Sequence, residues 1–336
     1  MKKLFFKFSA LLLLTAVAGC QNEQAAYVQE STFQESCNSL PLETNRVLTL
    51  AAVSNDWFQV YESHDQVYSI VEPYQFQMSI SHLIVGNERA VLFDTGMGIF
   101  PIRPIVEGIT DLPVLVVNSH THFDHVGGNN EFSDVLAIDS DYTKSNMKGF
   151  EHKEIAGDVI PAAFCGGAPA GFDVETYHTK SWNASRYVED GHLIDLGGRI
   201  LEILHVPGHT PDATALVDRE NGLLFTGDTF YDDNIWLFAP ETNIDDYSST
   251  IDRLVDIESA TEYLFGAHSS ARVDAGRLSQ LQSSLRKLRS GKVQPFEQVG
   301  KRLIYVIDGI TFVTAKEVLD GRQGDITIGG SGFGSW

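Results

Sequence analysis

The run His120-Thr121-His122-Phe123-Asp124-His125 gathers three imidazoles and one carboxylate within six residues. These four side chains cannot share one face of a helix, so we expect a loop whose backbone curls and brings them together. The apolar, β-branched run 113–117 directly before the motif predicts a strand that ends at this loop. Imidazole and carboxylate groups together suit zinc and similar divalent metals. The sequence therefore predicts a metal site at the end of a strand.

Four other short motifs occur in a fixed order around this run. They centre on Asp94 in Leu92-Phe93-Asp94-Thr95-Gly96, His209 in Val206-Pro207-Gly208-His209-Thr210-Pro211, Asp228 in Phe225-Thr226-Gly227-Asp228-Thr229, and His268 in Phe265-Gly266-Ala267-His268. With the first motif they resemble the metallo-β-lactamase superfamily over roughly residues 80–270. The resemblance implies an α/β fold, the αββα sandwich, in which two mixed β-sheets lie face to face with helices outside. The metals would then lie at one edge, on loops at strand ends.

The resemblance also implies two metal sites. The ligands would divide between two ions, with His120, His122 and His209 on the first, Asp124, His125 and His268 on the second, and Asp228 bridging both. Two Zn²⁺ per chain are the implied cofactors, although Fe and Mn also accept such ligands. A hydroxide shared by the two ions and oriented by Asp124 would make the chain a hydrolase. Asp94 would hold the first motif in place through a hydrogen bond, or it is simply a turn carboxylate.

The residues around Asp228 bear on the substrate. Metallo-β-lactamases proper generally lack a bridging aspartate, whereas the branches that cleave thioesters, lactones and phosphodiesters have one. Tyr231, three residues later, resembles the tyrosine of acyl-homoserine lactone lactonases, whose phenol stabilises developing negative charge; otherwise it is structural. We expect a small-molecule ester or lactone as substrate. A phosphodiesterase, a thioesterase, a β-lactamase and a non-catalytic metal-binding lipoprotein remain alternatives.

The N-terminus has the features of an export signal. Lysines at the start, the apolar run 11–14 and small residues before Cys20 predict a lipoprotein signal peptide over residues 1–19. Cys20 would be lipid-modified and anchor the chain to a membrane. Gln21 after the cysteine favours the periplasmic face of the outer membrane. Polar residues predict a flexible tether over 20–45, followed by one hydrolase domain over 46–336.

Cysteine usage and charge agree with an exported protein that does not bind nucleic acid. Cys37 and Cys165 are the cysteines that remain besides Cys20, so one disulfide is possible, although sequence does not show that the sulfurs meet. Removal of the three lysines in the signal lowers the formal charge from −21 to −24. Such a surface repels phosphate backbones.

Periodicity predicts the remaining elements. Strands are expected over 79–85, 90–94, 199–206 and 223–226, helices over 248–258 and 276–289, and a hairpin with an Asp-Gly turn over 302–314. An insertion at about 140–190 is rich in aromatic residues, which would form a substrate wall or lid, or pack the insertion onto its own domain. His82 reads as an ordinary strand residue, with a place at the metal mouth as the alternative.

Overall fold

Two large β-sheets form the centre of the structure, which describes residues 33–35 and 37–324 as a computed structural model. The first sheet has eight strands in chain order: β1 (Thr49–Leu50), β2 (Gln59–His64), β3 (Val67–Val71), β4 (Ile80–Val85), β5 (Ala90–Phe93), β6 (Val114–Val117), β7 (Val135–Ile138) and β8 (Arg186–Val188). The second has the order β15 (Val273–Asp274), β14 (Tyr263–Gly266), β12 (Leu223–Gly227), β11 (Thr214–Asp218), β10 (Ile200–His205) and β9 (Leu193–Asp195). Both sheets contain parallel and antiparallel pairs.

The two sheets face each other across an apolar core. Successive side chains of a strand point to opposite faces, and β5 shows this directly. Val91 and Phe93 belong to the buried cluster between the sheets, where Phe93 packs against Phe225 of the second sheet, whereas Leu92 belongs to a separate cluster on the outer side of the first sheet. Strands buried on both faces are apolar at every position, which explains why β5 reads as the continuous run Ala-Val-Leu-Phe.

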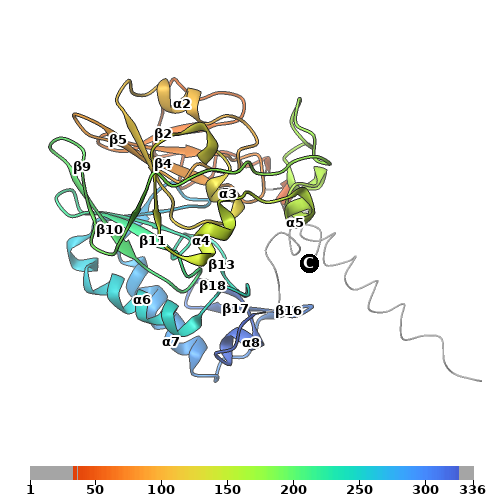
Figure 1. Cartoon of the computed structure of the whole chain (residues 1–336). Coiled ribbons are helices and arrows are strands. Elements are labelled where there is room, and N and C mark those ends of the chain that lie inside the picture. The colour runs from red at the N-terminus through yellow and green to blue at the C-terminus, as the bar shows by residue number, and fades with distance from the viewer. Residues whose placement is uncertain (1–32, 36, 325–336) are drawn as a thin grey trace, which may run out of the picture.

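Helices cover the outer sides of the sheets (Figure 1). The long helices α6 (Ile244–Asp256) and α7 (Arg277–Arg289) pack against the second sheet, and the leucine stripe of α7 is buried there. The shorter helices are α2 (Arg103–Glu107), α3 (Phe123–Val126), α4 (Asp141–Asn146), α5 (His152–Ile155) and α8 (Lys316–Leu319), with 3₁₀ turns η1 (Asn129–Glu131), η2 (Ala156–Asp158), η3 (Pro161–Ala163) and η4 (Glu258–Ala260). The expected mixed αββα arrangement is confirmed.

A third sheet adds to the two that the sequence predicted. It has the order β13 (Ile235–Leu237), β18 (Ile310–Ala315), β17 (Arg302–Ile307) and β16 (Glu297–Val299). The predicted hairpin over 302–314 forms β17 and β18, and its turn residues Asp308 and Gly309 both have positive φ, as a tight two-residue turn requires. The two expected sheets are present, and this additional sheet could not be predicted from local patterns because β13 pairs in parallel with β18 across a long stretch of chain.

The predicted strands and helices lie close to their expected bounds, and the insertion is mostly packed. Phe164, Tyr177 and Trp182 are buried in the outer core of the first sheet. These aromatic side chains therefore fix the insertion to its domain, which was one of the two expected roles.

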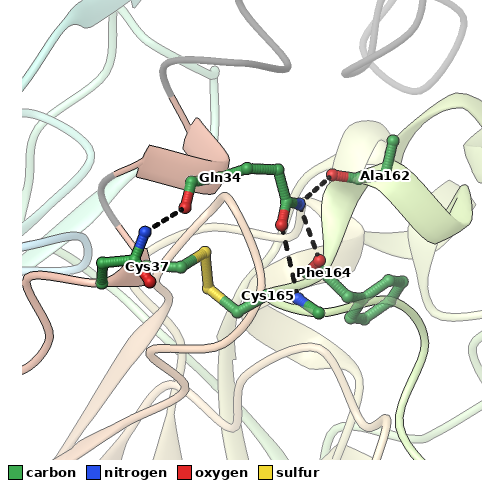
Figure 2. The surroundings of a disulfide bond; sticks show 7 residues. Gln34, Cys37, Ala162, Phe164 and Cys165 are labelled. Carbon is green, nitrogen blue, oxygen red and sulfur yellow. Dashed lines mark hydrogen bonds between the residues drawn. A yellow bond between two sulfur atoms is a disulfide. The ribbon is translucent and has the colours of Figure 1, made fainter.

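The N-terminal segment is attached to this insertion by a disulfide between Cys37 and Cys165 (Figure 2). Beside it, the side-chain amide of Gln34 donates hydrogen bonds to the carbonyl oxygens of Ala162 and Phe164, at 3.0 and 2.9 Å. Further along, the buried Asn45 donates to Ser269 O at 3.0 Å and accepts from the backbone N–H of Ala271 at 2.8 Å. A flexible tether was thus the wrong expectation for residues 33–35 and 37–45, which are held by covalent and polar contacts.

The predicted signal peptide 1–19, the lipidation site Cys20 and Gln21 lie outside the described residues. Within the part of the chain that the structure describes, no helix has the length and apolar character needed to span a membrane.

Candidate metal centre

All seven predicted ligands lie together at one edge of the sandwich, on loops that follow strands. His120 and His122 follow β6, and Asp124 and His125 form part of α3, a single helical turn that the sequence predicted as plain loop. His209 lies between β10 and β11, Asp228 follows β12 and His268 follows β14. All seven side chains are buried. The convergence that the motif order implied is therefore present in the fold.

One group of ligand atoms comes from three histidines. The atoms offered by His120, His122 and His209 all lie within 4.8 Å of one another. His122 Nδ1 lies 2.8 Å from His120 Nε2 and 3.3 Å from His209 Nε2. Three nitrogens that face one point are the donor set that zinc accepts.

A second group lies beside it and is more acidic. Asp124, His125 and His268 also offer atoms within 4.8 Å of one another. Asp124 Oδ2 lies 3.3 Å from His125 Nε2 and 3.7 Å from His268 Nε2.

The carboxylate of Asp228 lies between the two groups. Its Oδ1 is 3.0 Å from His268 Nε2 and 3.6 Å from His125 Nε2, whereas its Oδ2 is 3.3 Å from His268 Nε2 and 3.6 Å from His209 Nε2, so Oδ2 alone reaches the histidine group. One carboxylate therefore presents an oxygen to each group, which is the arrangement required of a bridging ligand.

Two buried polar atoms of this centre provide a test of whether cations fit. His125 Nε2 and Asp228 Oδ1 are shielded from solvent, and although each lies within 3.3 Å of another ligand atom, neither contact has the geometry of a hydrogen bond. A buried polar atom without a partner costs about 1–3 kcal/mol, and both atoms point to the place where the ligands converge. A divalent cation there would satisfy both, so the residues present fit a metal centre.

The outward nitrogen of every histidine in the centre has its own acceptor. His120 Nδ1 donates to Ser119 Oγ at 3.0 Å, His209 Nδ1 to Trp236 O at 3.0 Å and His268 Nδ1 to Gln77 O at 2.7 Å. Carboxylates accept from the other two, Asp94 from His125 at 2.9 Å and Glu241 from His122 at 2.7 Å. A proton held on the outward nitrogen leaves the inward lone pair free for a metal.

Asp94 has the geometry that the sequence suggested. Its carboxylate accepts from the backbone N–H of Ser119 at 2.6 Å and from Ser119 Oγ at 2.7 Å, in addition to His125. The residue has a φ of +66°, a left-handed conformation uncommon for a residue with a side chain but more accessible to aspartate. Asp94 therefore orients the first motif through hydrogen bonds to Ser119 and His125, so it is more than a turn carboxylate.

Gly227 allows Asp228 to come close to that motif. Its φ is +53°, and a Cβ at this position would lie 2.2 Å from Ser119 Cβ. No side chain fits there, so glycine at this position is a packing requirement of the centre.

Burial and charge set the protonation of the centre before any metal binds. Burial lowers the pKa of His209 to about 4, and burial together with the neighbouring imidazoles holds the pKa of His120 well below its usual value. Burial also opposes charge on His125 and His268, but the carboxylates of Asp124 and Asp228 outweigh it and raise the pKa of both. His120 and His209 are thus neutral, whereas His125 and His268 carry protons beside the carboxylates of Asp124 and Asp228.

Tyr231 does not offer a free hydroxyl. Its ring packs against His268, with ring centres 4.9 Å apart, and its hydroxyl donates to the backbone carbonyl of Asn234. Burial and the charge of Asp228 raise the pKa of Tyr231 well above its usual value. In this conformation the Tyr231 ring packs on His268. Its hydroxyl proton is engaged by Asn234 O, so the hydroxyl is not free to donate to a substrate as expected.

His82 is buried between the two sheets, where its ring packs edge-on against Phe225 and Phe265. Its Nε2 lies 2.8 Å from Gly266 O and its Nδ1 lies 3.0 Å from Ser69 Oγ, and burial lowers its pKa to about 4. The interpretation as an ordinary strand residue is confirmed.

Sequence reasoning missed Glu241 and the contribution of α4. Glu241 belongs to no motif and lies far along the chain from His122, so no spacing signals it. From α4, Tyr142 donates to Glu241 Oε1 at 3.1 Å, and Asn146 donates to the backbone oxygen of Thr121 at 3.1 Å. One part of the insertion thus supports the first motif directly.

Comparison with protein families gives a match to the model of the Metallo-beta-lactamase superfamily over residues 76–293. Among curated proteins, the chain is 28% identical to "Acyl-coenzyme A thioesterase MBLAC2" of Homo sapiens over 187 residues, which cover 52% of this chain and 66% of that protein. It is 26% identical to "Hydroxyacylglutathione hydrolase GloC" of Haemophilus influenzae over 161 residues, covering 48% of this chain and 70% of that protein. The chain thus spans just under two thirds of the length of the thioesterase.

Among solved structures, the fold is similar to that of the inverting sec-alkylsulfatase Pisa1 from Pseudomonas sp., with a TM-score of 0.53. The two sequences are 17% identical, and the match covers 69% of this chain and 42% of that chain. At this identity the likeness concerns the fold alone.

Proposed function

The chain belongs to the metallo-beta-lactamase superfamily, and from this premise we propose that it is a two-metal hydrolase acting on acyl thioesters. The observation that carries the two-metal proposal is the position of Asp228, whose two carboxylate oxygens face the two groups of ligands. The thioester class is supported by the names of two relatives, an acyl-coenzyme A thioesterase and a hydroxyacylglutathione hydrolase. An ester or lactone substrate is the second candidate, since an acyl carbonyl is attacked in each case.

In this proposal His120, His122 and His209 would hold one ion, Asp124, His125 and His268 would hold the other, and Asp228 would serve both. Zinc suits these donors, and iron or manganese would also accept them. When bound, two ions held in this way lower the pKa of a water molecule and polarise the bond under attack.

The protein itself orients the ligands and moves a proton. Asp94 keeps a proton on the outward nitrogen of His125, which fixes the direction of its inward nitrogen. Asp124 accepts a proton from the attacking water and returns it to the leaving sulfur. A carbon–oxygen bond forms at the acyl carbon as the carbon–sulfur bond breaks, and a carboxylic acid and a thiol are released.

We also propose that the enzyme works at the cell envelope, anchored through Cys20. The apolar run before Cys20 supports export. The disulfide between Cys37 and Cys165 is in keeping with an oxidising compartment.

A substrate panel tests the proposal. Protein beginning after Cys20 and loaded with zinc is offered acyl-coenzyme A thioesters, acyl-homoserine lactones, aryl esters, a phosphodiester and a β-lactam, with and without a chelator. We expect chelator-sensitive turnover that is fastest for thioesters. Faster turnover of lactones or esters than of thioesters would favour the second candidate substrate class. Metal binding without turnover of any compound would contradict a hydrolase.

A further inference from the structure

Glu241 is a largely buried carboxylate that the catalytic scheme above does not require for chemistry. Its side chain is 16% exposed and its Oε1 lies 2.7 Å from His122 Nε2. The residue belongs to the loop between β13 and α6, remote in sequence from the motif that it contacts.

His122 differs from the other histidines of the centre in the nitrogen that it turns inward. It presents Nδ1 to His120 and His209, whereas those two present Nε2. Its Nε2 therefore points outward, and Glu241 is the acceptor at that nitrogen. The carboxylate fixes the tautomer in which Nε2 carries the proton and Nδ1 carries the lone pair.

The same loop also holds His209. The hydroxyl of Thr242 donates to His209 O at 3.2 Å, and the backbone N–H of Asn243 donates to Gly208 O at 2.8 Å. Two of the three histidines in the first group thus depend on one short segment. A shift of that segment would move both inward nitrogens together.

The insertion fixes Glu241 from the other side. Tyr142 of α4 donates its hydroxyl to the same Oε1 at 3.1 Å, and its ring stands nearly perpendicular to the His122 ring. The carboxylate oxygen is therefore held between a phenol and an imidazole, which leaves it little freedom to turn away.

We propose that Glu241 is the positioning residue of the first metal site, and that Tyr142 holds it in place. The inference rests on the proposed two-metal function. The two ligand groups are then built alike, because in each a buried carboxylate accepts a hydrogen bond from one histidine. Asp94 accepts from His125 and Glu241 accepts from His122. A charged acceptor at the outward nitrogen makes the imidazole a stronger donor to the metal. Glu241 thereby sets how tightly the three-histidine site holds its ion.

Zinc affinity, measured by competition with a chromophoric chelator, tests this without reference to turnover. Glu241→Gln keeps the size of the side chain and removes its charge. Loss of such a partner typically weakens metal binding about 10–100-fold, and we expect that loss for one of the two ions. Tyr142→Phe, which leaves the carboxylate in place, should weaken the same ion by less than about 10-fold.

Matched controls identify the site and separate this inference from the proposed function. Glu220→Gln makes the same charge change at an exposed turn between β11 and β12 and should leave both affinities unchanged. Asp94→Asn should weaken the other ion. If Glu241→Gln and Glu220→Gln bind two zinc ions as tightly as the unaltered protein, Glu241 has no positioning role. If the unaltered protein binds no zinc, the proposed function itself is overturned.

Discussion

Removal of the disulfide between Cys37 and Cys165 should destabilise the protein and loosen one metal ligand. The bond joins residues 128 positions apart in sequence. The chain-entropy relation gives about 5 kcal/mol for a closed loop of this length. Because disulfides typically contribute less than this upper figure, we expect a loss of about 2–4 kcal/mol.

The loss should reach the metal centre through a short path. Cys165 N donates to Tyr74 O at 2.8 Å, and Phe76 N donates to Ala163 O at 3.0 Å, so the insertion holds the segment around residues 74–77. At the end of that segment, Gln77 O accepts from His268 Nδ1 at 2.7 Å. The zinc ion held by Asp124, His125 and His268 should therefore bind less tightly, by less than about 10-fold, without the disulfide.

Urea unfolding of the metal-free protein measures the first effect. The double variant Cys37→Ser/Cys165→Ser should unfold at lower urea, with a slope that is somewhat steeper because the unfolded chain exposes more surface without the cross-link. Its midpoint of thermal unfolding should fall by about 5 °C for a domain of this size. Reductant should bring the unaltered protein to the same midpoint and leave the variant unchanged. Coincident unfolding curves for the oxidised protein and the variant would refute the reasoning.

Two other predictions concern the centre itself. Tyr231→Phe should reduce the free energy of unfolding by about 1 kcal/mol, since the hydroxyl hydrogen bond to Asn234 is lost. Steady-state kinetics should show nearly unchanged turnover. A fall in turnover of about 100-fold or more would show that the hydroxyl takes part in catalysis. Zinc affinity should fall as pH falls through the raised pKa values of His125 and His268, because protons compete with the metal for the inward nitrogens. Calorimetric titration in buffers of different ionisation heat should detect proton release on zinc binding, and no release would contradict this assignment of protonation.

The convergence of the seven candidate ligands could be predicted from sequence because each lies in a short motif that resembles one of the superfamily's motifs and follows a strand. In the second sheet, the strands that precede His209, Asp228 and His268 follow one another in chain order, so their loops meet at one edge of the sandwich. Asp94 was found in the same way, since it directly follows β5. Local patterns also located α7, whose leucine stripe is set by the helical repeat.

Contacts between distant segments could not be predicted in this way. The pairing of β13 with β18 depends on where two short segments meet after folding. Glu241 could not be predicted for the same reason, because its role depends on contact with the outward nitrogen of His122 and the residues next to it in sequence give no sign of that contact. The N-terminal residues looked like a tether because they are polar, yet Asn45 is buried by hydrogen bonds to the segment after His268. Polar composition predicts weak apolar packing and says nothing of such specific pairs.

The most direct measurement of the central claim is the metal content of the protein and of an Asp228→Ala variant after zinc loading and dialysis. The account predicts two zinc ions per chain in the unaltered protein and fewer than two in the variant, because the carboxylate of Asp228 faces both groups of ligands. Two tightly held ions in both proteins, or one ion at most in the unaltered protein, would contradict the bridged two-metal centre.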